Sequence, residues 1–192
     1  MTTVLLVRHS VSTGGIGDAG LSDTGWELAR RAAARLTDRR PARIFTSPLR
    51  RARETAQCFA DRFRVPVSVD DRLRERENWG DLPDESWDDF VGRWERCNVE
   101  RDFARPEGVS SREAGARVDG FVREVTRADR SAVLAVSHGG AIVDFLLNFF
   151  PAADLVARKP DYREMVHCAL TVLDVQPDAY VLERFADPIL IE

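Results

Sequence analysis

The sequence predicts an α/β fold of three layers, in which helices cover both faces of a mostly parallel sheet of about six strands. Short β-branched runs alternate along the chain with longer segments of helical period, which is typical of βαβ units. The chain has 192 residues, 44% of them hydrophobic, which suffices for one domain with a sizeable core and is too short for two. We therefore expect residues 1–192 to form a single domain.

Three short apolar runs in the first half of the chain are predicted to be strands. They are rich in β-branched residues, and a segment of helical period follows each of the first two. These runs are residues 4–7 (VLLV), 42–47 (ARIFTS) and 65–69 (VPVSV).

Two helices are expected between these strands. The first covers about residues 25–38, and Thr24 with Glu27 forms a capping box at its start. The second begins at the Ser47-Pro48 pair, an N-cap followed by proline at the first helical position, and extends to about residue 63. Both place apolar residues along one face, so each should pack against the sheet.

Residues 71–108 lose clear periodicity and are interpreted as an inserted cap. This segment gathers Trp79, Trp87, Phe90 and Trp94 among many charged residues. The aromatic group has two interpretations, packing inside the cap or walls for an organic substrate. Packing is favoured, because tryptophan is usually buried.

The second half of the chain returns to the alternating pattern. Ser110 and Glu113 form a capping box that opens a helix, and this helix leads into a strand. A further helix ends at Pro151, and two strands joined by a turn complete the sheet. In order, the strand, the helix and the two final strands are residues 132–137, 141–150, 168–175 and 179–186.

Charge and cysteine content exclude several classes of protein. The 28 Lys and Arg residues stand against 32 Asp and Glu, and the net charge of −4 argues against a general binder of nucleic acid or anionic membranes. Cys58, Cys97 and Cys168 are widely spaced, without a CxxC pair or metal-ligand spacing, so we expect buried thiols in a reducing compartment. No targeting or membrane-spanning segment is recognised, which together with the thiols predicts a cytoplasmic protein. No bound metal is expected, because the cysteines lack metal-ligand spacing.

Two of the three histidines follow predicted strands directly. His9 follows the first strand and His138 follows the strand at 132–137. Because ligands of open α/β sheets bind beyond the carboxyl ends of strands, the two imidazoles should meet at one edge of the sheet. His167, at the start of a later strand, has no such partner.

An anion site is expected around these histidines. Gly139 and Gly140 open a helix, whose N-terminus attracts negative charge, and Arg8 precedes His9. The start of the second helix adds guanidinium groups that suit phosphoryl oxygens, and helical geometry alone does not choose among them. They belong to Arg50, Arg51 and Arg53.

Four segments together resemble the histidine phosphatase superfamily, in its phosphoglycerate-mutase-like branch. The resemblance covers essentially the whole chain, and the predicted topology agrees with the doubly wound sheet of that family. The segments are LVRHS at 6–10, TSPLRRARETA at 46–56, LRERENWG at 73–80 and VSHGG at 136–140.

The resemblance implies a role for each matching residue. His9 is expected to be the nucleophile that forms a phosphohistidine. Arg8, Arg51 and His138 are expected to surround the phosphoryl oxygens as three positive groups, with Ser12 and Gly139 also lining the phosphate pocket. Arg51 is chosen because it directly precedes the alanine of the motif.

The resemblance also implies a carboxylic acid that protonates the leaving alkoxide. Glu75 occupies the acid position of the L-x-E segment. Gly80 arrives one residue later than expected, so Glu77 takes the role if the register slips. The other interpretation of both glutamates is a surface salt bridge with a neighbouring arginine.

Several positions depart from the usual family pattern. Ser10, Val11 and Ser12 stand where Gly, Glu and Thr are typical, Gly15 lies near an expected Asn, and Val109 replaces a common Glu. The hydroxyls of Ser10 and Ser12 can still donate to phosphate. These departures leave the substrate and the catalytic efficiency open.

The expected function is that of a metal-independent phosphomonoesterase, without cofactor, acting on a small phosphorylated metabolite. The expected partner is thus a small phosphate ester, with no nucleic acid and no membrane, and a homodimer is possible. One alternative is phosphoglycerate mutase activity, and another is a catalytically weak module that binds a phosphorylated ligand.

Overall fold

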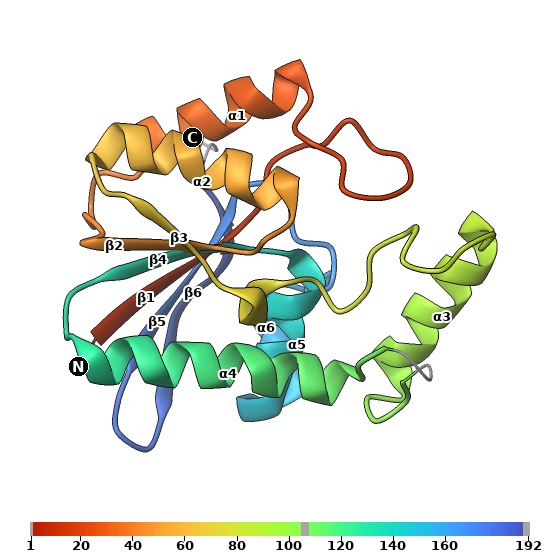
Figure 1. The fold of residues 1–192 in the computed structure, drawn as a ribbon. Helices are drawn as coiled ribbons and strands as arrows, with labels where there is room; N and C mark the ends of the chain where they lie inside the picture. Colours follow the sequence, from red (N-terminus) through yellow and green to blue (C-terminus); the bar gives the residue numbers. More distant parts are fainter. Residues whose placement is uncertain (1, 105–107, 190–192) are drawn as a thin grey trace.

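A computed structural model describes residues 2–104 and 108–189. The described chain forms six strands and six α-helices with one 3-10 turn (Figure 1). In chain order they are β1 (Thr2–Arg8), α1 (Asp23–Arg35), β2 (Arg43–Thr46), α2 (Arg50–Phe63), β3 (Val67–Val69), η1 (Asp71–Leu73), α3 (Trp87–Val99), α4 (Ser111–Ala128), β4 (Val133–Ser137), α5 (Gly139–Phe149), α6 (Ala152–Arg158), β5 (Ala169–Val175) and β6 (Tyr180–Pro188).

The six strands form one mixed sheet, in the order β3-β2-β4-β1-β5-β6. The pairs β2/β3, β2/β4 and β1/β4 are parallel, whereas β1/β5 and β5/β6 are antiparallel. The prediction of a mostly parallel, six-stranded sheet is confirmed. Because β1 and β4 are central and parallel, their carboxyl ends lie side by side.

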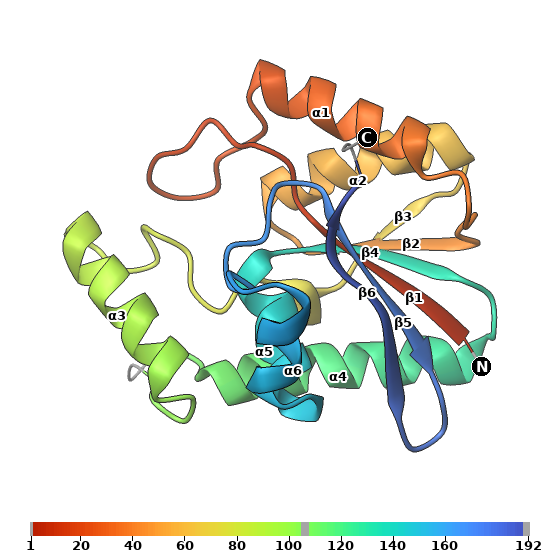
Figure 2. The same ribbon diagram turned by 180° about the vertical axis from the view of Figure 1, so that it is seen from behind.

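Helices cover both faces of the sheet, as predicted, and alternation along β1 explains why two cores form. Val4 and Leu6 belong to the core that includes α4 and α5, whereas Leu5 and Val7 belong to the core that includes α1 and α2. Successive side chains of a strand point to opposite faces, so a strand buried on both sides is apolar throughout. Figures 1 and 2 show the three layers from opposite sides.

Two predicted helix starts are wrong. Helix α1 begins at Asp23 and not near Gly25, because the Ser22 hydroxyl, and not that of Thr24, caps it by accepting from the backbone N–H of Gly25 at 3.1 Å. Helix α2 begins at Arg50, without a side-chain cap, rather than after Ser47. The predicted Ser110 capping box of α4 is confirmed.

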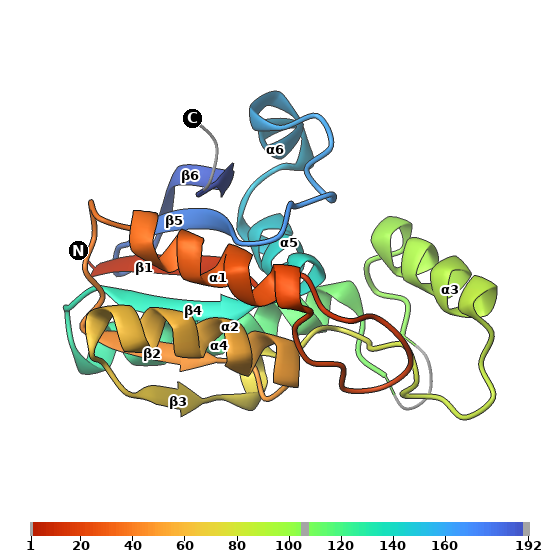
Figure 3. The same ribbon diagram turned by 90° about the horizontal axis from the view of Figure 1, so that it is seen from above.

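Helix ends and short helices were also incompletely predicted. Helix α1 ends at Arg35, earlier than residue 38, and the segment after Pro151 forms the unpredicted helix α6. Helix α3 lies inside the segment 71–108, and Ser86 caps its N-terminus. Figure 3 shows α3 standing to one side of the layered core. The description of 71–108 as an inserted cap remains a proposal.

Cysteine chemistry agrees with the sequence. Cys58, Cys97 and Cys168 are buried free thiols. Within residues 2–104 and 108–189, no helix combines the length and the apolar character needed to cross a bilayer.

The contact of α4 with α5 gives a stability test with a matched control. A Cβ at Gly115 would lie 2.3 Å from the backbone oxygen of Asp144, whereas a Cβ at Gly120 on the same helix would meet nothing within 4 Å. We expect Gly115→Ala to lower the free energy of unfolding by about 1–3 kcal/mol through overpacking. Gly120→Ala should raise it by about 0.5–1 kcal/mol, because alanine favours the helix. Urea denaturation of both variants measures the difference, and equal effects would contradict the close approach of α4 and α5.

Candidate active site

The two histidines predicted to meet do so at the carboxyl ends of β1 and β4. His9 and His138 have ring centroids 5.1 Å apart. The backbone N–H of His9 donates to the carbonyl of Ser137 at 2.9 Å, which continues the parallel pairing of the two strands past their ends. The sheet itself therefore brings these two imidazoles together.

Two contacts fix the tautomer of His9. Its Nδ1 lies 2.7 Å from the carbonyl oxygen of Ser10, and the Nε of Arg51 donates to its Nε2 at 3.2 Å. A carbonyl oxygen can only accept and a guanidinium N–H can only donate, so Nδ1 carries the proton and Nε2 keeps its lone pair. His9 is only 8% exposed, which shields this arrangement from water.

His138 is fully buried and its Nε2 lies 2.8 Å from the hydroxyl of Ser47. This contact explains the position of Ser47: its hydroxyl also accepts from the backbone N–H of Leu49, before helix α2 begins. Within the described chain, His138 Nδ1 has no hydrogen-bond partner.

His167 was expected to be without a partner, and this expectation is wrong. Its ring centroid lies 5.9 Å from that of His9, edge to face. Strand β5 runs antiparallel to β1, so the residues before it return to the edge where β1 ends; the backbone N–H of Cys168 donates to the carbonyl of Arg8 at 3.1 Å.

Burial keeps these imidazoles neutral. The pKa values of His9 and His138 lie well below the ordinary 6.5, first because of desolvation; for His9 the next cause is the charge of Arg51. Burial, together with the charge of Arg8, lowers the pKa of His167 to about 4. The same burial opposes the positive charge that the family resemblance implies for His138 beside the phosphate.

Of the three arginines left open at the start of α2, Arg51 faces the site. Besides its contact with His9, its Nη1 donates to Asn78 Oδ1 at 2.9 Å. Arg50 points elsewhere, in an exposed ion pair with Glu54 at 2.7 Å, and Arg53 is exposed. Asn78 was not singled out from the sequence.

Arg8 lies beside the site, and its Nη1 donates to the backbone carbonyl of Met165. Its Nε is buried without a hydrogen-bond partner within the described residues. Burial lowers the pKa values of Arg8 and Arg51 below the ordinary range of arginine, and the nearby carboxylate of Glu75 acts in the opposite direction on both. Two guanidinium groups and one carboxylate thus share a desolvated space.

The carboxylate of Glu75 is held by two backbone N–H groups. Its Oε2 accepts from Gly140 at 3.0 Å and its Oε1 from Arg76 at 2.9 Å. Glu77 is 3% exposed and forms an ion pair with Arg93 at 3.5 Å. Neither glutamate fits the alternative of a simple surface salt bridge.

Gly140 permits the close approach of two site residues. A Cβ at this position would lie 2.5 Å from the indole of Trp94 and 2.7 Å from Oε1 of Glu75. Any larger residue would displace one of them. Gly140 at the start of α5 therefore allows α3 to pack against the site.

Two cavities open onto this cluster and share Arg8, Glu75 and Trp94. The first, here called the aromatic cavity, has a volume of about 560 Å³, and the second, here called the histidine cavity, about 540 Å³. The aromatic cavity is lined by Arg8, Ser12, Gly14, Gly15, Gly17, Ala19, Arg51, Glu75, Glu77, Asn78, Trp79, Trp87, Phe90, Val91 and Trp94. The histidine cavity is lined by Arg8, His9, Glu75, Trp94, Gly139, Gly140, Arg163, Glu164, Met165, Val166 and His167.

The positions that depart from the family pattern have different surroundings. Ser10 is fully buried and its hydroxyl donates to the carbonyl of Gly25 at 2.7 Å, so it does not offer that donor to a phosphate. Ser12 and Gly15 line the aromatic cavity. Val109 is partly buried and lines neither cavity.

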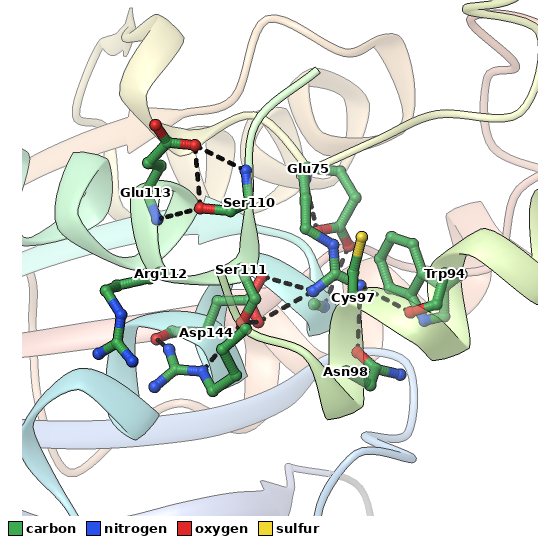
Figure 4. Close-up of polar contacts among 12 residues, drawn as sticks. Glu75, Trp94, Cys97, Asn98, Ser110, Ser111, Arg112, Glu113 and Asp144 are labelled. Atoms are coloured by element: carbon green, nitrogen blue, oxygen red, sulfur yellow. Dashed lines mark hydrogen bonds and ion pairs between the residues drawn. The ribbon is translucent and has the colours of Figure 1, made fainter. Parts of the chain in front are cut away.

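A buried ion pair anchors the segment that carries Glu75. Arg76 donates to both carboxylate oxygens of Asp144 at 3.0 and 3.1 Å, and both side chains are at most 1% exposed. Ser111 also donates to Asp144, at 2.5 Å (Figure 4). Burial raises the pKa of Asp144 to about 6, against the opposing pull of Arg76.

The same guanidinium reaches helix α3. Arg76 Nη2 donates to Asn98 Oδ1 at 3.0 Å and to the carbonyl of Trp94 at 3.4 Å, and its Cζ lies 4.1 Å from the centroid of the Trp94 ring. Arg76, which directly follows Glu75, therefore connects the segment of the candidate acid to both α3 and α5.

Comparison of the chain with models of protein families tests the family resemblance noted in the sequence. The family model described as histidine phosphatase superfamily (branch 1) matches residues 4–188. The chain belongs to this superfamily. The predicted enzyme class, a histidine phosphatase, is confirmed with it.

Curated relatives of this histidine phosphatase include glucosyl-3-phosphoglycerate phosphatases. The protein of that name from Mycolicibacterium vanbaalenii is 52% identical over 58 residues, which are 30% of this chain and 26% of that protein. The one from Mycobacterium tuberculosis H37Rv is 31% identical over 159 residues, 72% of this chain and 71% of the relative. The first match thus spans about a quarter of that relative's length.

A solved structure covers the whole chain. The mycobacterial glucosyl-3-phosphoglycerate phosphatase in complex with inorganic phosphate superposes with a TM-score of 0.80 and 25% identity over 100% of both chains. The fold of this histidine phosphatase is therefore that of its family. In the part of the chain that the structure describes, no three His, Cys, Asp or Glu side chains cluster in a way that would hold a metal ion.

The three histidines give a direct test of the electrostatics. In NMR titrations of the folded protein we expect His167 to titrate near 4 and His9 and His138 well below 6.5. Single His→Gln variants assign the signals, and the same titration in concentrated urea should return all three to about 6.5.

The sign of the linked effect on stability follows from these titrations. Because the folded protein keeps these imidazoles neutral while the unfolded chain binds protons below about pH 6.5, the three groups destabilise the fold as the pH falls through that window. A midpoint for His9 at or above 6.5 in the folded protein would contradict this description of the site.

Proposed function

We propose that this histidine phosphatase hydrolyses a phosphate monoester of a small molecule through a phosphohistidine on His9, without a metal ion. The observation that carries the proposal is the unprotonated Nε2 of His9, next to Arg51 and close to Arg8 at a cavity. A neutral imidazole with a free lone pair is a nucleophile, and two guanidinium groups supply the charge that phosphoryl transfer requires.

The proposed first step is attack of His9 Nε2 on phosphorus. The Glu75 carboxylate takes up the proton of the monoanionic ester as it binds. The N–P bond then forms, the bond from phosphorus to the ester oxygen breaks, and the leaving oxygen takes that proton from Glu75. The hydrogen bond from Nδ1 to the Ser10 carbonyl supports this step, because it stabilises the positive charge that develops on the ring. Arg51 releases Nε2 and turns its donors to the phosphoryl oxygens.

The proposed second step returns the enzyme to its starting state. A water molecule attacks phosphorus, the carboxylate of Glu75 accepts its proton, and the N–P bond breaks to regenerate His9. Inorganic phosphate leaves with that proton, so Glu75 is again a carboxylate. Arg8, Arg51 and the N-terminus of α5 at Gly139 stabilise the phosphoryl oxygens in both steps. Ser12 contributes a hydroxyl from the aromatic cavity.

Glu75 is preferred over Glu77 as the acid. Glu75 lines both cavities and lies close enough to Arg8 and Arg51 to act on their pKa values, whereas Glu77 forms an ion pair with Arg93. His138 has a positioning role in this proposal: its fully buried ring packs on His9 and holds Ser47.

The covalent intermediate is the decisive test. After treatment with a chelator, the wild-type protein should release phosphate from p-nitrophenyl phosphate, and rapid quenching should trap phosphate on the protein in an acid-labile, base-stable form. His9→Ala should lose both turnover and label. Binding of inorganic phosphate without turnover or label would instead favour a binding module, and conversion of 3-phosphoglycerate to 2-phosphoglycerate faster than phosphate release would favour a mutase.

The identity of the acid can be tested with two leaving groups. Glu75→Gln should lower kcat/KM for ethyl phosphate by about 10²–10⁴-fold, because an alkoxide needs protonation as it leaves. It should affect p-nitrophenyl phosphate much less, since the phenolate leaves without a proton. Glu77→Gln is the matched control and should lower both activities to a similar extent. The proposal for Glu75 fails if Glu77→Gln shows the leaving-group dependence instead.

A further inference from the structure

The aromatic cavity has one wall made almost entirely of rings. Trp87, Phe90, Val91 and Trp94 occur at helical spacing on α3, so they form one face of that helix, and Trp79 continues the wall. Consecutive ring centroids lie 4.9 Å apart for Trp79 and Trp87, 5.5 Å for Trp87 and Phe90 and 6.0 Å for Phe90 and Trp94. The rings thus support one another as a continuous surface.

These aromatic side chains do not pack in the protein core. Trp87 is 52% exposed, and Cys97 is the one buried residue among those of α3 that the structure describes. A half-exposed indole next to two further rings is apolar surface that a ligand can cover. Sequence reasoning favoured packing inside the cap, and the structure assigns this group to the cavity lining as well.

A second part of the lining is a glycine-rich loop that leaves space for a ligand. Gly14, Gly15 and Gly17 have positive φ, and a Cβ on any of them would meet no atom within 4 Å. The loop is tied to the aromatic wall by two hydrogen bonds, from Gly17 N–H to the carbonyl of Trp79 at 2.9 Å and from Asn78 Nδ2 to the carbonyl of Gly17 at 3.0 Å.

The charges of the cavity are unevenly distributed. Its cationic lining residues are Arg8 and Arg51, both next to His9 and both assigned to the phosphoryl group by the proposed function. The remaining charged lining residues are Glu75 and Glu77. A carboxylate on the organic part of a substrate would therefore meet rings and two acidic residues in this cavity, and no cationic lining residue beyond the two already assigned to the phosphoryl group.

We propose that the aromatic cavity binds the leaving group of the substrate, and that this group is an uncharged alcohol bearing a flat ring rather than a phosphorylated carboxylic acid. This inference rests on the proposed function, because Arg8, Arg51 and Glu75 join the cavity to the phosphate. The ring stacks on Trp87 and Phe90, while the ester oxygen stays beside Glu75. Release of the alcohol then exposes the phosphohistidine to water.

Substrates that differ in one group at a time test this assignment. Ethyl phosphate, 2-phenylethyl phosphate and the phosphate ester of phenyllactate share an alkyl leaving oxygen. The second adds a phenyl ring to the first, and the third adds to the second a carboxylate on the carbon that bears the phosphate. We expect kcat/KM to rise at least about tenfold from the first to the second, since one tenfold step is about 1.4 kcal/mol and ring burial supplies more than that. It should fall at least about tenfold from the second to the third.

Substitutions in the wall provide a second measurement. Trp87→Ala should lower the preference for 2-phenylethyl over ethyl phosphate by about 2–10-fold, the range expected for one ring contact. Trp26→Ala is the matched control, because Trp26 packs against the core beneath α1 and α2 and does not line the cavity. Phe90→Arg adds a cation to the wall and should raise activity on phenyllactate phosphate relative to 2-phenylethyl phosphate.

Failure of this inference is distinguishable from failure of the proposed function. If no ester is hydrolysed and no phosphohistidine is trapped, the proposed function fails. If 3-phosphoglycerate, O-phosphoserine or phenyllactate phosphate is preferred over 2-phenylethyl phosphate, the enzyme stands and the inference is overturned. Arg163→Ala then identifies the reason, because Arg163 in the histidine cavity is the cation that would hold such a carboxylate. An unchanged ring preference in Trp87→Ala also overturns it.

Discussion

The ion pair between Arg76 and Asp144 holds together the parts of the molecule on which the site depends. Both side chains are excluded from water, and their charges are compensated by each other and by Ser111, Asn98 and the backbone. Removing one partner of such a pair costs about 3–5 kcal/mol, because the other charge remains buried without compensation. Because Asp144 lies on α5 and Arg76 directly follows Glu75, the pair joins α5 to the segment that carries the candidate acid.

The consequence of this anchoring is the geometry of the acid and of the aromatic wall. The N–H of Arg76 and the N–H of Gly140 hold the two oxygens of Glu75, while the guanidinium of Arg76 packs on Trp94. A displacement of Arg76 would therefore move the candidate acid and the cavity wall together. The nucleophile is held differently, by the ends of β1 and β4, so attack on phosphorus and protonation of the leaving group depend on separate parts of the fold.

The sequence predicted the layered fold and the meeting of His9 and His138 because both follow from local patterns. Apolar runs reveal buried strands, and parallel strands bring their carboxyl ends to one edge. The choice of Arg51 and Glu75 came from the family resemblance, since a helix start rich in arginine does not show which guanidinium faces the site. Helix α3 was missed although residues 87, 90, 91 and 94 have helical spacing, because its apolar face lines a cavity and not the core.

Other contacts of the site had no signal in the sequence. His167 approaches His9 because β5 runs antiparallel to β1, and strand direction is set by sheet assembly rather than by local propensity. Arg8 is held by a backbone carbonyl, that of Met165, which any residue could supply. The Arg76–Asp144 pair joins residues 68 positions apart, among many arginines that make only exposed ion pairs.

One part of the site lies on the buried core and the other part lies on helix α3, which is less strongly anchored. The first part carries the residues proposed for phosphoryl transfer, and the second carries the rings proposed to bind the alcohol. Arg8 ends the central strand β1, His9 follows it, and Arg51 lies on helix α2, and the apolar faces of both elements are buried in the core. Helix α3 buries Cys97 and is held mainly by polar contacts from Arg76 and Arg93. Elements with few buried apolar contacts open at lower free energy than a core sheet. Substitutions on the face of α3 that lines the aromatic cavity therefore alter which alcohol fits beside the rings while the attack on phosphorus is preserved.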